Sequence, residues 1–395
     1  MASISIRHNK NGTTAYILRA YAGRDECGRS RYLSKTYTPS PGTGKRKIDR
    51  MLQQICTELD LEAQKQNLFD ARQRFSDYCR HFLQQRALSC SEYTLHNYRI
   101  SLKKVCNYIG PVSLEQLRPS HLSRMYASLS SSGSQYGKPY SAATIRHLHT
   151  LVRMVLGQTV RERILAVNIA DRAHYAPPKA EKKEPVFLEL SEARAYIRAA
   201  LTEEDLRIRL MVLLFLYTGM RREELCGLEW SDIDFGKEEI AVRRASVYIS
   251  GKGVRTKLPK NDSSIRLLKA DPLVFDALRD YREWYARLRI AAGNSWSGGD
   301  RLFVRQNGLP ILPGIMVTWL KRFAKKHGLR PVTPHKLRHT YATLQIFYGT
   351  DLRTVADSMG HSTPATTLTI YSHQVKRSAA KAAAAMSAML TPKSE

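Results

Sequence analysis

The stretch TGMRREEL, from Thr218 to Leu225, says more about the fold than any other part of this sequence. It follows an apolar run, 210–217, which is too short to cross a membrane and predicts a buried helix. Gly219 is expected to end that helix and Arg221 to begin the next, with Glu224 one turn later on the same face. An arginine held this way can bind a phosphate, although an exposed salt-bridged helix start has the same pattern.

Two further clusters lie nearer the C-terminus. Residues 334–340 read PHKLRHT, so His335 and Arg338 are three apart and share a helix face. One can move protons near neutral pH and the other is a permanent cation. The third cluster holds His361, in Met-Gly-His, and then Tyr371, in Tyr-Ser-His. Each cluster alone fits an ordinary basic surface or a hydrogen-bonded histidine, but their combination on one basic chain indicates a site.

In this order the clusters resemble the tyrosine recombinase (phage integrase) family. The family patterns T-G-hydrophobic-R-x-x-E-L, H-x-L-R-H, hydrophobic-G-H and Y-x-H match residues 218–225, 335–339, 359–361 and 371–373. The resemblance covers nearly the whole chain and is greatest to integrases of conjugative transposons. It implies a site-specific DNA recombinase that carries out the integration and excision reactions of a mobile element.

The family also places a catalytic lysine in a hairpin between the first two clusters, often within P-K-T-x-x-S-x-R. Residues 259–266 read PKNDSSIR, so Lys260 matches, with Asn in place of Thr. Lys257 is the competitor. The proline expected soon after Arg266 is Lys269 here, which leaves the register between the two lysines open.

The resemblance assigns the proton transfers to three residues. Tyr371 attacks the scissile phosphate, forms a 3′-phosphotyrosyl bond and frees a 5′-hydroxyl. Lys260 protonates the departing 5′ oxygen, and His335 handles the tyrosine proton. The phosphotyrosine keeps the bond energy, so a partner strand can reverse the step through a Holliday junction.

The resemblance also assigns three residues to binding of the phosphate and a fourth to holding one of them. Arg221 and Arg338 stabilise charge on the non-bridging oxygens. His361 hydrogen-bonds the phosphate, and Glu224 lies behind Arg221. This chemistry requires no cofactor and no metal, which agrees with the absence of a P-loop or an acidic metal cluster from the sequence.

Strand exchange needs four active sites around two duplexes, so the resemblance implies a homotetramer on double-stranded DNA, at the element ends and the target site. An accessory excision protein or a host DNA-bending protein is a further expected partner. The Ala-rich tail 376–395 is expected to form a helix that docks on a neighbouring subunit.

The expected fold is multidomain and mainly α with small β parts. Alternating segments at Ser3–Arg7, Ala15–Tyr21 and Arg31–Tyr37 predict a three-stranded sheet, followed by a helix over 46–64. The expected parts are an arm-type DNA-binding domain (1–66), an all-α core-binding (SAM-like) bundle (67–175), a Pro-rich charged linker (176–184), a mixed α/β catalytic domain (185–375) and the tail helix (376–395).

Five basic residues are candidates for DNA contact outside the catalytic domain. Alternation along the strands places Arg19, Arg31 and Lys35 on a solvent face. Arg146 and Arg153 lie off the apolar stripe of a helix in the second domain. A solubilising surface has the same pattern, and DNA contact is favoured because the whole chain is basic.

Charge decides the class of partner. Sixty-three Lys and Arg against 35 Asp and Glu give a formal charge of +28, which favours a polyanion bound through its phosphates. The basic residues run through the whole chain rather than forming the short cluster typical of membrane binding. The six cysteines show no zinc-ligand spacing, and residues 1–10 contain no apolar signal region. We therefore expect a bacterial cytoplasmic protein associated with the nucleoid, without a membrane partner.

Two other functions fit parts of the pattern. A type IB topoisomerase uses the same nucleophile chemistry and would relax supercoils without site preference. A non-catalytic, sequence-specific DNA-binding regulator would keep the basic surface with a decayed site. The sheet at the start of the chain favours an integrase over the topoisomerase, and the intact set of site residues counts against decay.

Overall fold

The computed structural model divides into two compact units, Met1–Lys182 and Lys183–Glu395, which are described separately. Their boundary falls inside the Pro-rich charged segment in which a linker was expected. The structure describes residues 2–8, 13–24, 30–133, 137–173, 175–178, 186–258 and 265–360, without the side chains of 23–24 and 64–70. No helix in these ranges is long and apolar enough to cross a membrane.

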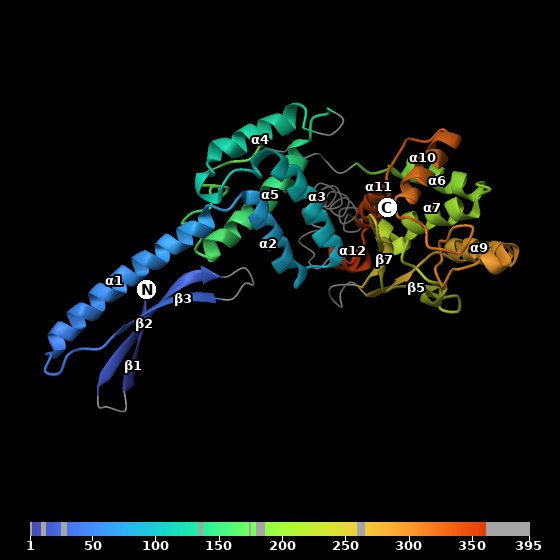
Figure 1. Ribbon diagram of the computed structural model, residues 1–395. Coiled ribbons are helices and arrows are strands. Elements are labelled where there is room, and N and C mark those ends of the chain that lie inside the picture. The colour runs from blue at the N-terminus through green and yellow to red at the C-terminus, as the bar shows by residue number, and fades with distance from the viewer. Residues whose placement is uncertain are drawn as a thin grey trace, which may run out of the picture. The chain divides into compact units, whose positions relative to one another are not determined.

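The first unit begins with the predicted three-stranded sheet. Strands β1 (Ser3–His8), β2 (Thr14–Arg24) and β3 (Ser30–Tyr37) are antiparallel, in the order β1-β2-β3. Helix α1 (Lys45–Ala71) lies along one face of this sheet (Figure 1). It is longer than the helix expected over 46–64, because no glycine or proline occurs before its end. The expected boundary after residue 66 therefore falls inside α1.

Apolar side chains of the sheet and of α1 form a small core of their own. Alternate residues of β2 point towards the helix, and Leu18 and Ala20 are almost fully buried there. Leu52 and Leu59, seven residues apart, recur on the covering face of α1. The opposite face of the sheet carries Arg19 together with Ile17 and the aromatic pair of Tyr21 and Tyr32.

A helical bundle completes the first unit, as predicted. Its helices are α2 (Phe75–Ala87), α3 (Glu92–Ile109), α4 (Pro119–Ser131) and α5 (Ala142–Arg161). The side chains of Ser91 and Ser141 cap α3 and α5 by accepting hydrogen bonds from backbone amides three residues on. A separate apolar core with the buried aromatic side chains of Phe75 and Tyr126 holds the bundle together.

The second unit is built around one buried helix, α7 (Leu206–Thr218), whose apolar residues face every direction. The helices packed against it are α6 (Leu190–Leu201), α9 (Pro272–Ala292), α10 (Ile315–Lys326) and α11 (Pro334–Phe347). Two short helices complete the described part, α8 (Arg222–Leu225) and α12 (Leu352–Met359). The buried end of α7 thus delivers the TGMRREEL stretch to the junction of α8 and α11.

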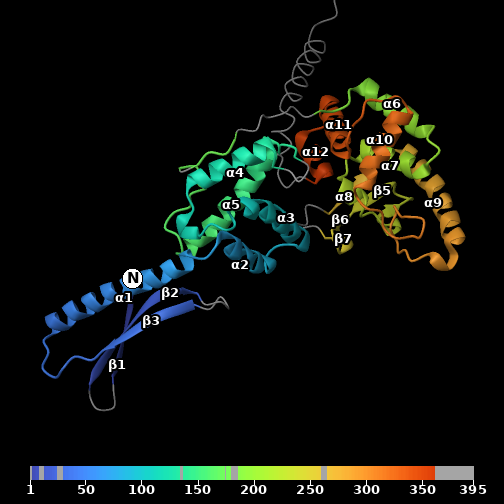
Figure 2. The same ribbon diagram turned by 45° about the horizontal axis from the view of Figure 1, so that its top comes forward.

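Small antiparallel sheets flank α8 in the predicted strand-rich region. One sheet has the order β4-β5-β8, formed by β4 (Ile233–Asp234), β5 (Glu239–Val242) and β8 (Arg266–Lys269). The other is a hairpin of β6 (Ala245–Ile249) and β7 (Gly253–Lys257), which packs beside α8 (Figure 2). The expectation of a multidomain, mainly α fold with small β parts is confirmed.

Candidate active site

A sharp turn between α7 and α8 sets the direction of Arg221. Gly219 ends α7 in the left-handed conformation, with φ +60°. A Cβ atom on Gly219 would lie 2.3 Å from the ring of Tyr341 in α11, so only glycine fits here. The chain then restarts at Arg221, the cap residue of α8. The turn leaves the Arg221 side chain partly open to solvent, at 39% exposure.

Glu224 holds Arg221 as the sequence predicted. One carboxylate oxygen accepts from Arg221 Nη1 at 2.8 Å, and the other accepts from the backbone amide of Arg221 at 2.8 Å. Arg266 of β8 binds the same carboxylate, with Nη2 at 2.8 Å and Nη1 at 3.2 Å. Burial alone would raise the pKa of Glu224. The hydrogen bonds and charges of the two arginines outweigh burial and lower that pKa to about 2.

Arg338 is buried on α11 and joins two helix ends. Its side chain donates from Nη1 to the carbonyl of Gly219, at 2.7 Å, and from Nη2 to the carbonyl of Met359. The residue is 2% exposed, so these bonds satisfy donors that water hardly reaches. The amino end of α11 is stabilised by the side chain of Thr333, which caps it, and by Pro334 in its first turn.

The carboxyl end of α12 gathers three arginines. The carbonyl of Ser358 accepts from Arg266 Nε at 2.6 Å, and the carbonyl of Gly360 accepts from Arg221 Nη2 at 2.9 Å. Met359, between them, is the acceptor for Arg338. Cations suit this position because the carbonyl end of a helix carries partial negative charge. Gly360, with φ +62°, closes α12 beside the guanidinium of Arg266.

His335 stands at the amino end of α11, where its ring reaches solvent. Desolvation by neighbouring atoms lowers its pKa, and the charges of Arg338 and Arg221 lower it further. His339, one turn later, contacts it edge to face, with 4.4 Å between ring centroids. Burial, then His335 and Arg338, lower the pKa of His339 to about 4. Both rings are therefore neutral at pH 7, and a neutral His335 can accept a proton.

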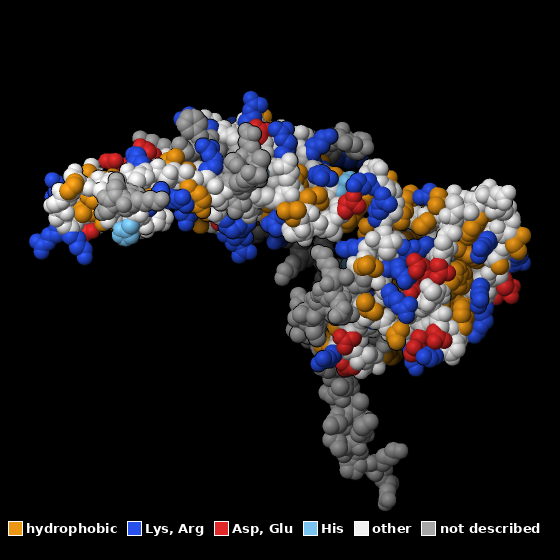
Figure 3. Space-filling model, turned by 60° about the horizontal axis from the view of Figure 1, so that its bottom comes forward, with side chains coloured by type: hydrophobic (Ala, Val, Ile, Leu, Met, Phe, Trp, Pro, Cys, Tyr) orange, Lys and Arg blue, Asp and Glu red, His pale blue; other side chains and the backbone are white. Residues whose placement is uncertain are grey.

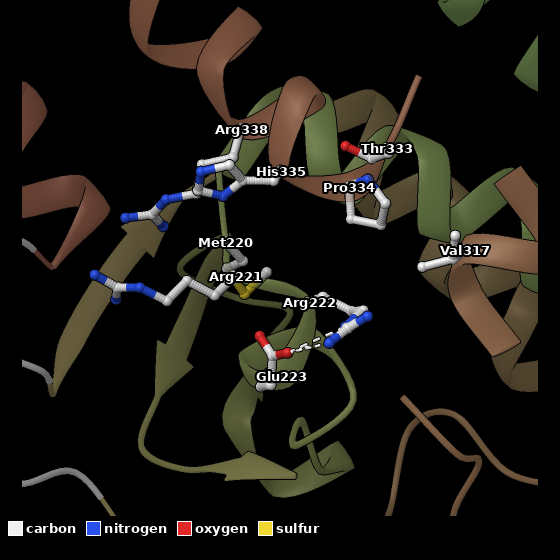
Figure 4. Close-up of a pocket in the computed structure, with 9 residues that line it drawn as sticks. All are labelled: Met220, Arg221, Arg222, Glu223, Val317, Thr333, Pro334, His335 and Arg338. Atoms are coloured by element: carbon white, nitrogen blue, oxygen red, sulfur yellow. Dashed lines mark hydrogen bonds and ion pairs between the residues drawn. The ribbon is translucent and has the colours of Figure 1, made fainter. Parts of the chain in front are cut away.

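These groups open onto a pocket of about 390 Å³ between α8 and α11. Figure 4 shows His335 and Arg338 on α11 and Arg221 below them, with the guanidinium groups of Arg338 and Arg221 extending to the same side of the view. The lining residues are Met220, Arg221, Arg222, Glu223, Val317, Thr333, Pro334, His335 and Arg338. The two guanidinium groups of Arg221 and Arg338 can bind a phosphate, and the neutral imidazole of His335 can accept a proton from a hydroxyl group beside it. Across the described ranges no group of three His, Cys, Asp or Glu side chains could hold a metal ion.

The structure brings together four of the seven predicted catalytic-domain residues: Arg221, Glu224, His335 and Arg338. Lys260, His361 and Tyr371 lie outside the described residues. His361 directly follows Gly360, whose carbonyl binds Arg221.

The alternative lysine, Lys257, is the last residue of β7 and is paired with Ala245 of β6 in the hairpin. Lys260 belongs to the connection between β7 and β8, and the choice between the two lysines stays a prediction.

Sequence reasoning missed the importance of Arg266, which had served only to align the lysine motif. Its side chain is 7% exposed and connects β8 to Glu224 and to α12. The available signal was a basic residue on the same strand face as the buried Leu268. Its partners are 42 and 92 residues away, however, and no local pattern reveals them.

The amino-terminal sheet leaves its three candidate cations accessible to different degrees. Arg19 and Arg31 are exposed, and Lys35 is 42% exposed at its side chain although it lies on the face that α1 covers. Lys35 pairs in register with Leu18, which points at α1, and its ammonium lies 3.2 Å from Glu62 of that helix. The strand alternation was right in period, but the helix covers the face on which Lys35 lies. Whether any of these residues contacts DNA stays a prediction.

The two basic residues singled out in the helical bundle both lie off its apolar stripe, as expected. Arg146 is exposed, and Arg153 is 53% exposed at its side chain while it pairs with Asp171. Lys and Arg side chains are spread over the described surface of both units in the view of Figure 3. The bundle therefore offers cations to an anionic partner, but DNA contact at these positions stays a prediction.

Comparison with known proteins agrees with this geometry. Residues 187–377, which contain the whole pocket, match the phage integrase family. A XerC-like tyrosine recombinase of Caldanaerobacter subterraneus subsp. tengcongensis is 27% identical over 386 residues, 93% of this chain and 94% of that protein. Residues 187–377 belong to the phage integrase family, and the chain is a tyrosine-type recombinase. It is thus a site-specific DNA recombinase, and the topoisomerase and regulator alternatives gain no support.

Other relatives of this recombinase are integrases. The ICEBs1 integrase of Bacillus subtilis is 26% identical over 233 residues, which are 59% of this chain and 62% of that protein. The Tn1549 transposon integrase, solved with a circular intermediate DNA, covers 78% of this chain at 19% identity and a TM-score of 0.65. A lambda integrase tetramer on a Holliday junction covers 91% at 20% identity and a TM-score of 0.54. At such identities the solved structures show that the recombinase shares their fold.

Proposed function

We propose that this recombinase cuts and rejoins double-stranded DNA at the ends of a mobile element with Tyr371 as its nucleophile. The observation that carries the proposal is the convergence of Arg221, Arg338 and a neutral His335 on one pocket. Arg221 and Arg338 also bind the carbonyls of Gly360 and Met359, which directly precede the segment that holds His361 and Tyr371. Two fixed guanidiniums can stabilise the negative charge that grows on the non-bridging oxygens when the phosphorus becomes pentacoordinate. The transposon and phage integrases among the relatives support a mobile element as the substrate.

The proposed reaction uses these groups together with Lys260. The Tyr371 oxygen attacks the phosphorus and gives up its proton to the neutral His335. The bond from phosphorus to the 5′ oxygen breaks, and Lys260 supplies the proton that this oxygen takes. Arg221 and Arg338, with His361, hold the non-bridging oxygens throughout. The product is a 3′-phosphotyrosyl enzyme and a free 5′-hydroxyl, and the reverse attack by a partner strand completes the exchange.

Assembly is part of the proposal. Exchange of two duplexes requires four subunits, so we infer a homotetramer on DNA, helped by an accessory excision protein or a host DNA-bending protein. The tail 376–395, outside the described residues, is proposed to dock on the neighbouring subunit. Its deletion is expected to weaken synapsis without abolishing binding to a single site, as measured by gel shift. We infer that the enzyme works in the bacterial cytoplasm, at the nucleoid.

Covalent trapping tests the chemistry directly. The wild type is incubated with nicked suicide duplexes cut from the element's ends, in the presence of EDTA, and the products are separated on denaturing gels. A protein–DNA band is expected in the wild type and not in Tyr371→Phe. Tyr348→Phe is the matched control, because Tyr348 belongs to the same unit and is 61% exposed; it should retain the band.

Each other outcome points elsewhere. Tight binding to the element ends without any covalent band would favour a DNA-binding regulator. A band together with relaxation of supercoiled plasmids that lack the element ends would favour a type IB topoisomerase. A band that persists in Tyr371→Phe would assign the nucleophile to another residue.

A further inference from the structure

Glu224 has two effects on Arg221 that oppose each other. Its carboxylate fixes the guanidinium by charge-assisted hydrogen bonds, which is useful for orienting Arg221 towards the pocket. The same negative charge cancels the positive charge that Arg221 offers to a phosphate. A pair of Arg221 and Glu224 alone would be neutral, and a neutral pair stabilises an anionic transition state poorly.

Arg266 supplies the missing charge. It binds both oxygens of Glu224 and is itself 7% exposed, so its charge is little screened by water. The three side chains together carry two positive charges and one negative, a net charge of +1. The Arg266 Nε donates to the carbonyl of Ser358, and this bond keeps the guanidinium behind Glu224 rather than in the pocket.

We infer that Arg266 is a positioning residue for DNA cleavage, which allows Glu224 to orient Arg221 without cancelling its charge at the scissile phosphate. It touches no reacting atom and acts through Glu224. The inference rests on the proposed function. In that reaction the tyrosine oxygen forms a bond to phosphorus, the bond to the 5′ oxygen breaks, and the growing negative charge lies on the non-bridging oxygens. The effect of Arg266 is on those oxygens and not on the proton of the leaving group.

Arg266→Gln and Glu224→Gln, alone and together, test the coupling. Arg266→Gln leaves Arg221 paired with a full negative charge, and covalent cleavage of suicide duplexes is expected to slow about a hundredfold. In the Glu224→Gln background that charge is gone, so adding Arg266→Gln is expected to cost less than about tenfold. Arg266→Lys keeps the charge and should stay within about tenfold of the wild type.

Two modified substrates identify what Arg266 acts on. A methylphosphonate at the scissile position lacks the charge that Arg221 stabilises, so the defect of Arg266→Gln should shrink below about tenfold. A bridging 5′ sulfur leaves without a proton, so with that substrate the defect should remain about a hundredfold. Arg244→Gln is the matched control, because Arg244 is 15% exposed and binds Glu229 and Asp232 away from the pocket residues; it should cleave normally.

The remaining outcomes overturn the inference. Rescue by the 5′ sulfur alone would mean that Arg266 acts on the leaving-group proton, through the segment that carries Lys260. An equal loss on all three substrates, with the same loss in Arg266→Lys, would mean that it only maintains the fold. Wild-type cleavage by Arg266→Gln would remove its role. If the wild type itself forms no covalent product, the proposed function fails first, and the inference falls with it.

Discussion

Two buried glutamates in the second unit, Glu203 at 3% and Glu224 at 7% exposure, both have a pKa lowered to about 2, but they stand in different surroundings. Glu203 lies between α6 and α7 and binds Lys326 at 2.8 Å and His327 at 3.1 Å. Glu224 binds Arg221 and Arg266. Burial raises the pKa of either carboxyl, but hydrogen bonds and neighbouring positive charges outweigh it and lower both values to about 2. The two therefore look equivalent when they are judged by electrostatics alone.

The difference lies in where the partners point. Lys326 and His327 hold the end of α10 beside Glu203, and Lys326 faces solvent. The cations around Glu224 face the pocket and the end of α12. A perturbed carboxylate therefore indicates function only when its partners border a cavity that can take a substrate. Four predictions test this contrast between the Glu203 region and the Glu224 region.

The largest expected effect is that of Arg338→Lys. A lysine cannot bridge the carbonyls of Gly219 and Met359 and also present a fork to phosphate, so covalent cleavage should fall roughly 10²–10³-fold. Arg330→Lys is the matched change near α6, where Arg330 binds Glu192 and the carbonyl of Phe187. It should cleave within a few-fold of the wild type. Equal losses in both variants would erase the contrast.

His335→Gln is expected to slow cleavage about a hundredfold, because it removes the proton acceptor. Its pKa lies below the ordinary 6.5, so wild-type cleavage should be independent of pH above about 6.5 and fall below it as the ring is protonated. The His335→Gln variant should lack this fall in rate at acid pH, which we call the acid limb. His327→Gln, beside Glu203, should retain both the rate and the limb. An inflection well above pH 7 in the wild type would contradict the assignment of His335.

Glu203→Gln and Glu224→Gln should separate stability from activity. Glu203→Gln removes the anion that binds two side chains of the α10 end, and it is expected to lower the melting temperature by roughly 3–6 °C while cleavage persists. Glu224→Gln should slow cleavage about tenfold because Arg221 loses its ionic anchor. Thermal melts and single-turnover cleavage on the same preparations compare the two. A Glu203→Gln protein that melts normally but cleaves poorly would reverse the assignment.

The smallest effect concerns acid stability. Each carboxyl titrates near 4.5 when unfolded and near 2 when folded, so the unfolded chain binds more protons between these values. Stability from both glutamates is therefore fully present above pH 4.5 and is lost as pH falls towards 2. Replacing either glutamate with glutamine should make this loss shallower, as read from melting temperatures at pH 5, 4 and 3. Unchanged slopes would show that the carboxyls titrate normally in the fold.

Much of the fold was predictable, because its signals are local. The alternation of residues 3–37, the caps at Ser91 and Ser141, and the apolar run before Gly219 each lie within one element. The pairing of Arg221 with Glu224 was predictable for the same reason, since three residues separate them on a helix start. Periodicity and capping report on neighbours in the chain, and these features depend on nothing else.

What escaped prediction depends on partners distant in sequence. The ion pair of Lys35 with α1 was not predicted, because the face of β3 that α1 covers follows from the packing of a helix at least eight residues further along the chain. Arg266 was overlooked because its acceptors come from α8 and α12. The left-handed Gly219 was recognisable as a helix end, but its closeness to Tyr341 appears only when α11 is packed.

The short length of α12 has a consequence for how the site forms. Eight residues make too few hydrogen bonds for a helix to persist by itself in water. Its last carbonyls are instead held by arginines from three other elements, and Val355 and Met359 pack on α11. Opening of α12 would remove one backbone acceptor from each of Arg221, Arg266 and Arg338 at once. Pocket and helix should therefore form one cooperative unit, whose amides exchange with solvent together rather than one by one.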